Sequence, residues 1–320
     1  MQTLRHALLA SLLLAAASIA QAQSFPSKPV RLIVPYPAAG AVDIVSRLLA
    51  DKLGGSLGTT VIVENKAGAA GMIGADQMAK SAPDGHTLAM ITVSSHAIAP
   101  SVYKSMPYDP IVDFAMVSLT ANTPYIITVN PSVPARSLRE LIALAKAKPG
   151  ALNFGSSGTG TTPHLAGELF NTLAGVKINH IPYKGSAPMV NDLLGGQVQV
   201  AFDNTVIPNI KAGKLIGLAV TSGTRLAAVP DIPTAIEAGL AGYEAVGWMG
   251  LAAPKGTPAD VVARLSRDTA RGMGQPDVVE KLTALGFQSA SNSPEQFTAY
   301  VRAEITKWAK VVKDAGITAE

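Results

Sequence analysis

Two short segments of small and hydroxyl-bearing residues contain the groups best suited to binding an anion. Residues 36–43 include Ala38-Ala39-Gly40-Ala41, and residues 155–162 are a run of Gly, Ser and Thr that leads to His164. No bulky side chain hides the backbone N–H groups, and a helix start leaves its first N–H groups without internal partners. Because neither segment contains Arg, a carboxylate there would be held by neutral N–H and O–H donors. The same composition also suits tight turns that bind nothing.

Catalytic and metal-binding chemistries fit the sequence less well. A hydrolytic triad can be assembled on paper from Ser156, Ser157, His164, Asp203 and His96. However, the segment around the serines does not match the G-x-S-x-G nucleophile elbow, and no dinucleotide or P-loop motif occurs. The chain has no Cys, and no two of its 5 His residues are spaced i, i+3 or i+4, so we expect no metal and no cofactor. We interpret His164, just inside a helix start, as a neutral hydrogen-bonding group or loop brace.

Alternating strands and helices in two blocks must position these segments. Apolar runs in the first block predict strands at residues 30–34, 60–63 and 87–93, and helical spacing predicts helices from residue 41 and over residues 71–82. In the second block we expect strands at residues 152–154, 177–181, 198–202 and 215–220. Helices there begin at the Ser137 capping box, at Pro163 as first helical residue, and at Ala187. The succession predicts an α/β fold with two similar-sized, parallel or mostly parallel sheets.

The C-terminal third is expected to be mostly helical. Thr257 and Ser293 each precede a Pro and are predicted to be N-caps, and Gln296 is placed to complete a capping box with Ser293. A stripe of apolar residues at helical spacing indicates core packing rather than a binding cluster: Phe297, Tyr300, Val301, Ile305, Trp308 and Val312.

Composition and the first residues indicate an exported globular protein. The chain has 320 residues, 48% of them hydrophobic and 15% charged, which supports a large core. With 26 Lys plus Arg against 22 Asp plus Glu and no dense basic block, nucleic acid is not expected as a partner. Residues 1–22 combine Arg5, an apolar run and Ala20-Gln21-Ala22, which predicts a signal peptide cleaved near Ala22 and a periplasmic protein. The alternative is a membrane anchor, but the run is shorter than the roughly 20 residues that a spanning helix needs.

Several segments, in order along the whole mature chain, carry a family resemblance. They are Val34-Pro35-Tyr36-Pro37-Ala38-Ala39-Gly40-Ala41-Val42-Asp43, Val63-Glu64-Asn65-Lys66-Ala67-Gly68-Ala69-Ala70-Gly71, Pro83-Asp84-Gly85-His86-Thr87, Pro182-Tyr183-Lys184-Gly185, Phe202-Asp203-Asn204, Ala253-Pro254-Lys255-Gly256-Thr257-Pro258 and Glu304-Ile305-Thr306-Lys307-Trp308. With these segments the chain resembles the substrate-binding receptors of tripartite tricarboxylate transporters, often called Bug proteins.

The resemblance implies a type II periplasmic-binding-protein fold, in which two α/β domains close on a carboxylate in the cleft between them. By analogy the first domain comprises residues 23–122 and 248–320, and the second comprises residues 123–247. Trp248 is then a hinge, pocket or buried interdomain residue. The implied partners are a small organic carboxylate and the membrane permease subunits of the transporter, and we expect a monomer.

The resemblance also implies which residues bind the ligand. One loop of each domain would grip a carboxylate group through backbone amides and hydroxyls, while Lys184, Asn204 and His96 would help to line the domain walls. The full set of implied ligand-binding residues is Tyr36, Ala38, Ala39, Gly40, Ala41, Asp43, Ser94, Ser95, Ser156, Ser157, Gly158, Thr159, Gly160, Thr161, Thr162, His164, Tyr183 and Asp203.

At one place the sequence departs from the family pattern. Relatives usually carry Gly-Gly, a small residue and a polar one where this chain has Ala39-Gly40-Ala41-Val42. One glycine's conformational freedom and one side-chain donor are therefore lost. We expect capture of a carboxylate by domain closure, without chemistry, for delivery to the permease. The alternatives are a carboxylate sensor for a two-component system and, in third place, a periplasmic hydrolase.

Overall fold

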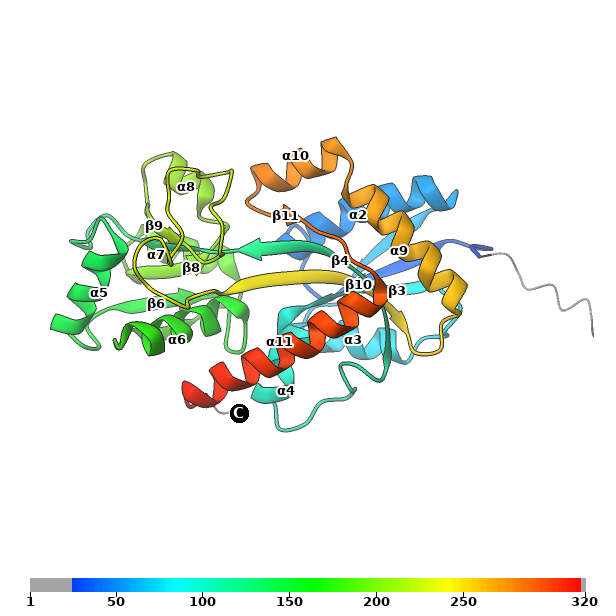
Figure 1. Cartoon of the computed structure of the whole chain (residues 1–320), viewed down its shortest axis with the longest axis horizontal. Coiled ribbons are helices and arrows are strands. Elements are labelled where there is room, and N and C mark those ends of the chain that lie inside the picture. The colour runs from blue at the N-terminus through cyan, green and yellow to red at the C-terminus, as the bar shows by residue number, and fades with distance from the viewer. Residues whose placement is uncertain (1–24, 318–320) are drawn as a thin grey trace, which may run out of the picture.

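The computed structural model describes residues 25–317, so the predicted signal peptide lies outside the described residues. The chain forms two mixed sheets flanked by helices (Figure 1), which confirms the α/β class and the two similar-sized sheets. The first sheet has 6 strands in the order β11-β4-β10-β3-β1-β2, and the second has 5 in the order β7-β6-β8-β5-β9.

The first sheet collects strands from both ends of the described chain. Its strands are β1 (Val30–Val34), β2 (Val61–Asn65), β3 (Thr87–Thr92), β4 (Phe114–Pro124), β10 (Val246–Pro254) and β11 (Gln288–Ser289). Its helices are α2 (Ala41–Leu57), α3 (Met72–Ala79), α4 (Ala99–Val102), α9 (Ala259–Met273), α10 (Pro276–Ala284) and α11 (Pro294–Asp314), with a 3-10 turn at Ala69–Gly71 and a π-helical turn at Ser94–Ile98. In Figure 1, α2, α9 and α10 lie on one side of this sheet and α3, α4 and α11 on the other.

The second sheet is built from the middle of the chain. Its strands are β5 (Ile126–Val129), β6 (Asn153–Ser156), β7 (Asn179–Pro182), β8 (Val200–Asp203) and β9 (Ile216–Val220). Its helices are α5 (Leu138–Ala147), α6 (Thr162–Ala174), α7 (Ser186–Leu194) and α8 (Ile207–Lys211). Met189 of α7 and Ile207 of α8 belong to one apolar cluster, whereas Leu141 of α5 and Phe170 of α6 belong to another. The two faces of the sheet are therefore covered by different helices.

Two antiparallel segments join the sheets. β4 runs out of the first sheet into β5 through Tyr125, and β10 returns beside β4, so that the two long strands lie side by side in Figure 1. Thr221, at the end of β9, ties both crossings together: its hydroxyl accepts from the Tyr125 N–H at 2.8 Å and donates to the Ala245 carbonyl at 2.7 Å. The predicted domain boundaries at 122/123 and 247/248 fall in this region and stay a prediction.

Buried contacts anchor the C-terminal helix beneath the crossing. The indole N–H groups of Trp248 on β10 and Trp308 on α11 both donate to Glu304 Oε2, at 3.1 and 2.9 Å. Trp248 is 1% exposed, so it is a buried residue close to the second crossing. Phe297 and Trp308 on the predicted apolar stripe are fully buried, which confirms core packing for these residues.

Three expectations about the fold need correction. The sheets are mixed rather than mostly parallel, because β10 pairs antiparallel with β3 and β4, and β5 pairs antiparallel with β8 and β9. Pro258, not Thr257, is the N-cap of α9, since the Thr257 hydroxyl donates to the Pro254 carbonyl. Helix α6 begins at Thr162, one residue before the predicted start at Pro163. The Ser293 capping box with Gln296 is confirmed.

Candidate functional site

Both small-residue segments connect a strand to the start of a helix. The first leads from β1 to α2 with Gly40 as N-cap, and the second leads from β6 to α6 with Thr161 as N-cap. Neither N-cap side chain bonds the helix, so the first N–H groups of both helices have no cap from that residue. In α6, Pro163 removes one of these donors and leaves the N–H groups of Thr162 and His164.

The two segments converge near Tyr125, in the first crossing between the sheets. Burial raises the pKa of Tyr125, a hydrogen bond with Thr162 lowers it, and the nearby Asp203 and Tyr36 raise it further. Thr162 of the second loop and Tyr36 of the first loop therefore both lie near the Tyr125 phenol. Gly160 also lies against the first sheet's helices, since a Cβ added there would lie 3.4 Å from Cγ1 of Val102. Tyr36 and Thr162, more than 120 positions apart in the sequence, therefore lie near the same tyrosine.

A buried carboxylate holds the first loop. Asp43 is 2% exposed, and its Oδ2 accepts from the Ala39 N–H at 2.9 Å and from Arg47 Nε at 2.8 Å. Its Oδ1 accepts from Asn65 Nδ2 at 2.9 Å. Burial alone raises the pKa of Asp43, but the bonds from Arg47, Asn65 and Ala39 outweigh it and leave the pKa lowered. The carboxylate thus carries a negative charge, and its hydrogen bonds join the loop, α2 and β2.

The exposed part of the first loop is the segment before α2. Ala38 and Ala39 are exposed, Gly40 and Ala41 are half-buried, and Val42 is 9% exposed. Ala39 adopts a positive φ of 63°, the conformation in which a glycine would be free of strain. The glycine that this chain lacks, relative to the family pattern, is therefore missing at a position where its freedom would be used.

Tyr36 connects the first loop to the end of β3. Its hydroxyl lies 3.1 Å from Thr92 Oγ1 and donates to the Ala70 carbonyl at 3.2 Å. Burial raises the pKa of Tyr36, while Thr92 and Ser94 lower it through hydrogen bonds. Ser94 thus lies beside the Tyr36 phenol.

Ser95 and His96 lie deeper than Ser94 and are fully buried. Ser95 Oγ is 2.9 Å from His96 Nδ1, and the imidazole packs against Tyr108 and Phe114 with centroid separations of 5.6 and 4.5 Å. Burial lowers the pKa of His96 to about 3. The imidazole is therefore neutral and part of an aromatic layer rather than an exposed wall.

The hydroxyls of the second loop mostly bond within the loop itself. Ser156 Oγ lies 3.1 Å from both the Gly158 N–H and the Gly158 carbonyl, and 2.6 Å from His180 Nε2. Ser157 Oγ donates to Thr161 Oγ1 at 3.3 Å, and Thr161 Oγ1 donates to the Gly158 carbonyl at 2.7 Å. Thr159 is exposed at the tip. Since three of the hydroxyls already have acceptors, backbone N–H groups become the main candidates for donating to a ligand.

His164 braces the second loop, as the sequence predicted. Its Nδ1 accepts from the Gly160 N–H at 3.2 Å, and burial lowers the pKa of His164 to about 4. The ring stacks on His180 with centroids 3.8 Å apart. Sequence reasoning missed His180, because its contact with His164 depends on the parallel register that places His180 opposite Phe154.

Two further predicted site residues bond to the elements of the second sheet. Asp203 is 2% exposed, and its carboxylate accepts from Ser186 Oγ and from the N–H and hydroxyl of Thr205 at 2.7 to 2.8 Å. The Tyr183 hydroxyl donates to Asp192 at 2.7 Å, and burial and this bond raise the pKa of Tyr183 to about 12. Both side chains therefore position α7 beside the second loop.

The structure does not assemble the triad considered from sequence. Ser156 contacts His180 rather than His164, Ser156 is fully buried, and Asp203 bonds hydroxyls and an N–H rather than an imidazole. Burial, together with His164, lowers the pKa of His180 to about 3, which makes it a poor general base at neutral pH. Within residues 25–317 no group of three or more His, Asp or Glu is placed to hold a metal ion. No described helix is both long and apolar enough to cross a bilayer.

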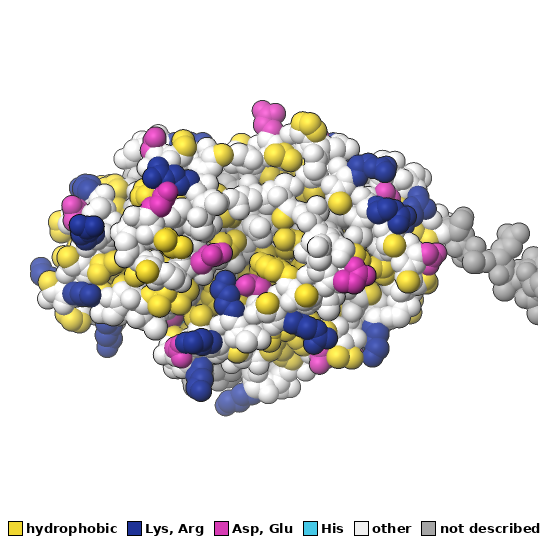
Figure 2. All heavy atoms as spheres, in the orientation of Figure 1, with side chains coloured by type: hydrophobic (Ala, Val, Ile, Leu, Met, Phe, Trp, Pro, Cys, Tyr) yellow, Lys and Arg dark blue, Asp and Glu magenta, His cyan; other side chains and the backbone are white. Residues whose placement is uncertain are grey.

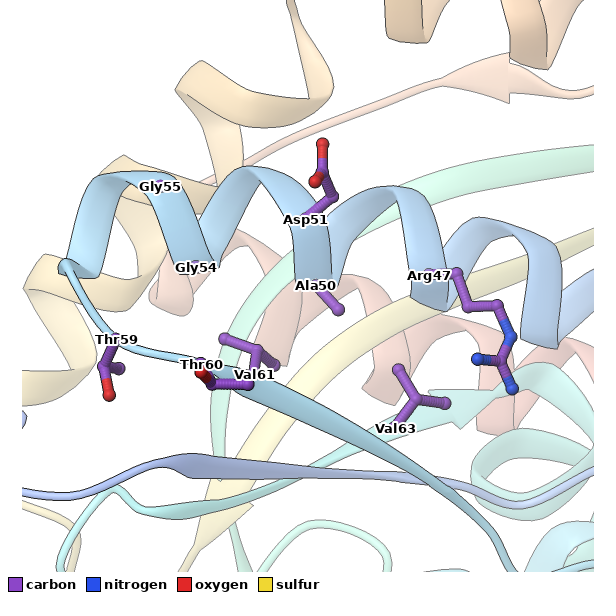
Figure 3. Close-up of a pocket in the computed structure, with 9 residues that line it drawn as sticks. All are labelled: Arg47, Ala50, Asp51, Gly54, Gly55, Thr59, Thr60, Val61 and Val63. Atoms are coloured by element: carbon purple, nitrogen blue, oxygen red, sulfur yellow. The ribbon is translucent and has the colours of Figure 1, made fainter.

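The surface grooves lie apart from the two loops. A groove of about 470 Å³ follows α2 and the edge strand β2, from Arg47 to Thr59 and Thr60 (Figure 3), and no residue of either loop lines it. A second groove, of about 320 Å³, separates α6 from the end of α11. On the face shown in Figure 2, Lys and Arg side chains are dispersed rather than gathered into a patch.

Comparisons with known proteins identify the family of this chain. A model of the tripartite tricarboxylate transporter family receptor matches residues 45–317. The chain belongs to this receptor family. Protein BugT of Bordetella pertussis is 39% identical over 298 residues, which cover 92% of this chain and 91% of BugT.

Solved relatives share the whole fold of this receptor. An R. palustris protein solved with adipate superposes with a TM-score of 0.86 at 38% identity, covering 92% of this chain and 100% of that one. MatC from Rhodopseudomonas palustris, solved with bound malate, gives 0.81 at 32% identity, covering 90% and 100%. The periplasmic binding protein BugD gives 0.83 at 36% identity, covering 92% and 100%. The periplasmic-binding-protein fold implied by the resemblance is thereby confirmed.

Proposed function

We propose that the receptor captures an organic carboxylate between its two loops and delivers it to the permease subunits of a tripartite tricarboxylate-type transporter. The observation that carries this proposal is that Tyr36, in the loop that leads to α2, and Thr162, at the start of α6, both lie near Tyr125. Each helix start favours a negative charge through its free N–H groups and its dipole. Adipate and malate, bound by relatives, each have two carboxylates, so one can meet each loop.

The ligand-binding donors in this proposal are the backbone N–H groups of residues 41–43 in the first loop and of Thr159, Thr162 and His164 in the second, because those of Gly40, Gly160 and Thr161 already bond within the protein. Asp43, Asp203 and Tyr183 act behind these loops, because their polar atoms already bond to the protein. Tyr36 and Ser94 form the wall on the side of β3, and Tyr125 forms the floor at the crossing. Negatively charged side chains next to the ligand would repel it, so a positioning role for Asp43 and Asp203 also agrees with electrostatics.

Binding is coupled to closure of two domains, residues 23–122 with 248–320 and residues 123–247. A ligand that touches both loops stabilises the closed form over the open form, and only such differential affinity can shift the equilibrium. The protein works in the periplasm after removal of residues 1–22, and no chemical step on the ligand is part of the proposal.

A thermal-shift screen of residues 23–320 tests the binding function. Adipate and malate are compared with adipamide, which has the length of adipate but no carboxylate. A carboxylate at 100 times its dissociation constant is expected to add about 2.7 kcal/mol to the free energy of unfolding, whereas adipamide adds nothing. If a broad panel of mono-, di- and tricarboxylates leaves the melting temperature unchanged, carboxylate capture is wrong.

A further inference from the structure

Two imidazoles are stacked directly behind the second loop. His164 lies in the first turn of α6 and His180 lies in β7, with ring centroids 3.8 Å apart and planes inclined by 18°. Phe154 continues the stack, 5.0 Å from His180. Each imidazole bonds a different end of the loop, so the pair spans it.

The hydrogen bonds define which nitrogen of the His164 ring carries hydrogen. His164 Nδ1 accepts from the Gly160 N–H, so its hydrogen must lie on Nε2. Ser156 Oγ accepts from the Gly158 N–H, and its only hydrogen can go to the Gly158 carbonyl at 3.1 Å. His180 Nε2 lies 2.6 Å from the same oxygen, and either nitrogen or oxygen donates the hydrogen of that contact, depending on the tautomer of His180. All these bonds are satisfied together when both rings are neutral.

The imidazoles hold the backbone of two glycines: His164 bonds Gly160 directly, and His180 reaches Gly158 through Ser156 Oγ. Gly158 has φ 137° and Gly160 has φ 73°, conformations that glycine adopts freely and that it also leaves freely. Besides the contacts to the imidazoles, the Thr161 hydroxyl also holds Gly158, by donating to its carbonyl. The Gly158 N–H donates to Ser156 Oγ, which His180 contacts, and the Gly160 N–H donates to His164 itself. The N–H groups of Thr162 and His164 at the helix start are left for a ligand.

We infer that His164 and His180 are positioning residues that preorganise the second loop for a carboxylate, and that His164 does so only as a neutral ring. This inference rests on the proposed function. A proton added to His164 occupies Nδ1 and removes the acceptor of the Gly160 N–H. A second positive charge on His180, at stacking distance, adds repulsion. Acid therefore releases the loop and with it the ligand.

The surroundings keep the pair neutral at pH 7. Burial lowers the pKa of His164 to about 4, and burial together with His164 lowers the pKa of His180 to about 3. On α6 itself, Glu168 Oε1 lies 3.9 Å from His164 Nε2, and burial raises the pKa of Glu168. On the elements packed against α6, Asp203 lies at the end of β8, and Lys307, Lys310 and Asp314 of α11 line the groove beside Leu169 and Leu173. Helix α11 also carries Glu295, Arg302, Glu304 and Lys313.

The first test needs no ligand. Amide hydrogen exchange by NMR gives protection factors for the N–H groups of Gly158 and Gly160, with the Ala39 N–H, held by Asp43, as the matched control in the other loop. We expect His164→Leu to lower the Gly160 protection factor by about tenfold, because one buried hydrogen bond is lost. His164→Asn, whose Oδ1 replaces Nδ1, is expected to restore it. At the second imidazole, His180→Leu is expected to lower the protection factor of the Gly158 N–H, and His180→Gln is expected to restore it.

Acid titration of the wild type completes this test. Protection of Gly160 is expected to fall as the ring ¹⁵N signals of His164 report its protonation, while protection of Ala39 is unchanged over the same step. If the loop amides keep their protection in His164→Leu and His180→Leu, or through protonation of His164, the inference is wrong. Should the Leu variants fail to fold, the wild-type titration and the amide variants decide it.

Calorimetric titration with adipate then separates this inference from the proposed function. We expect His164→Leu to weaken adipate binding about tenfold at pH 7 and His164→Asn to restore it. Equal adipate affinity in all variants, with a loosened loop, contradicts the positioning role but not carboxylate capture. No adipate binding by the wild type, with the exchange results as expected, counts against adipate capture while the neutral-ring brace stands.

Discussion

The two loops that we propose as ligand-binding share a topology and differ in what holds them. The first loop, residues 36–43, is tied to the buried carboxylate of Asp43, which accepts three hydrogen bonds and pairs with Arg47. The second loop, residues 157–161, is tied to the neutral rings of His164 and His180. Asp43 keeps its charge and its hydrogen bonds as long as the pH lies above its lowered pKa. His164 instead loses its acceptor for the Gly160 N–H when its ring gains a proton. The same task is therefore solved with opposite charge requirements.

The largest effect is expected when either loop is blocked. Gly40→Arg fills the first loop and Thr162→Pro removes an N–H from the second, at a position where the extended Thr161 backbone (φ −85°, ψ 160°) accepts a following proline. If the ligand needs both loops, each variant abolishes the thermal stabilisation of about 2.7 kcal/mol that a carboxylate gives at 100 times its dissociation constant.

Thr162→Val is the matched control for the second loop, because it keeps the N–H and loses only the hydroxyl. Retained carboxylate stabilisation in Thr162→Pro would show that the second loop's amide is not a ligand donor. Retained stabilisation in Gly40→Arg would remove the first loop from the site.

The next effect is the pH dependence of the free energy of unfolding that His164 causes. The unfolded chain takes up a proton at His164 near pH 6.5, while the folded chain does so only at about 4, so folding is fully stabilised above pH 6.5 and loses stability as pH falls to about 4. For His164 the loss amounts to about 3 kcal/mol over this window. Urea unfolding of the wild type and His164→Asn from pH 7 to 4 measures it, and the variant should show the shallower slope. Parallel slopes would mean that folded His164 titrates normally.

Removal of the charged brace is expected to cost less. Asp43→Asn retains an acceptor for the Ala39 N–H but loses the charge that Arg47 contacts, which predicts a loss of about 1 to 3 kcal/mol in the free energy of unfolding. Asp51→Asn on the exposed face of α2 is the control and should change stability by less than about 0.5 kcal/mol. Because the pKa of Asp43 is lowered, its contribution is present above about pH 4 and disappears below it. An unchanged unfolding midpoint in Asp43→Asn would show that Asp43 does not brace the loop.

The smallest expected effect is a gain in the first loop. Ala39 has φ 63°, where an L-residue with a Cβ is strained, so Ala39→Gly should stabilise the protein by up to about 1 kcal/mol. Ala38→Gly, at the neighbouring exposed position, lacks this relief and should not stabilise. Thermal unfolding of both variants checks the difference, and a destabilised Ala39→Gly would rule out strain at this residue.

Local signals in the sequence predicted much of the fold but not its crossings. Val30–Val34 and the Ser293 capping box were predictable because strand propensity and N-capping act over a few residues. β10 was not predictable, since Gly247 and Gly250 weaken its strand pattern. A side chain at Gly247 would clash with Tyr125, and one at Gly250 would clash with Phe297. Its antiparallel position between β3 and β4 depends on tertiary contacts and cannot be predicted from a local sequence pattern.

The candidate site shows the same limit. The two loops could be predicted from their small residues and their place before helices. That Asp43 faces the Ala39 N–H, and that His180 stacks on His164, depends on loop geometry and on the register of β6 against β7. Asp43 and His164 were predicted site residues, but the contacts of Asp43 and the participation of His180 became visible only with the three-dimensional structure.

The central claim is that both loops hold one carboxylate ligand together. A crystal structure of the receptor with the carboxylate that gives the largest thermal shift tests it most directly. The account predicts ligand oxygens within hydrogen-bonding distance of N–H groups in both residues 41–43 and residues 159–164. A ligand that contacts only one loop, or lies in the α2–β2 groove instead, would contradict it.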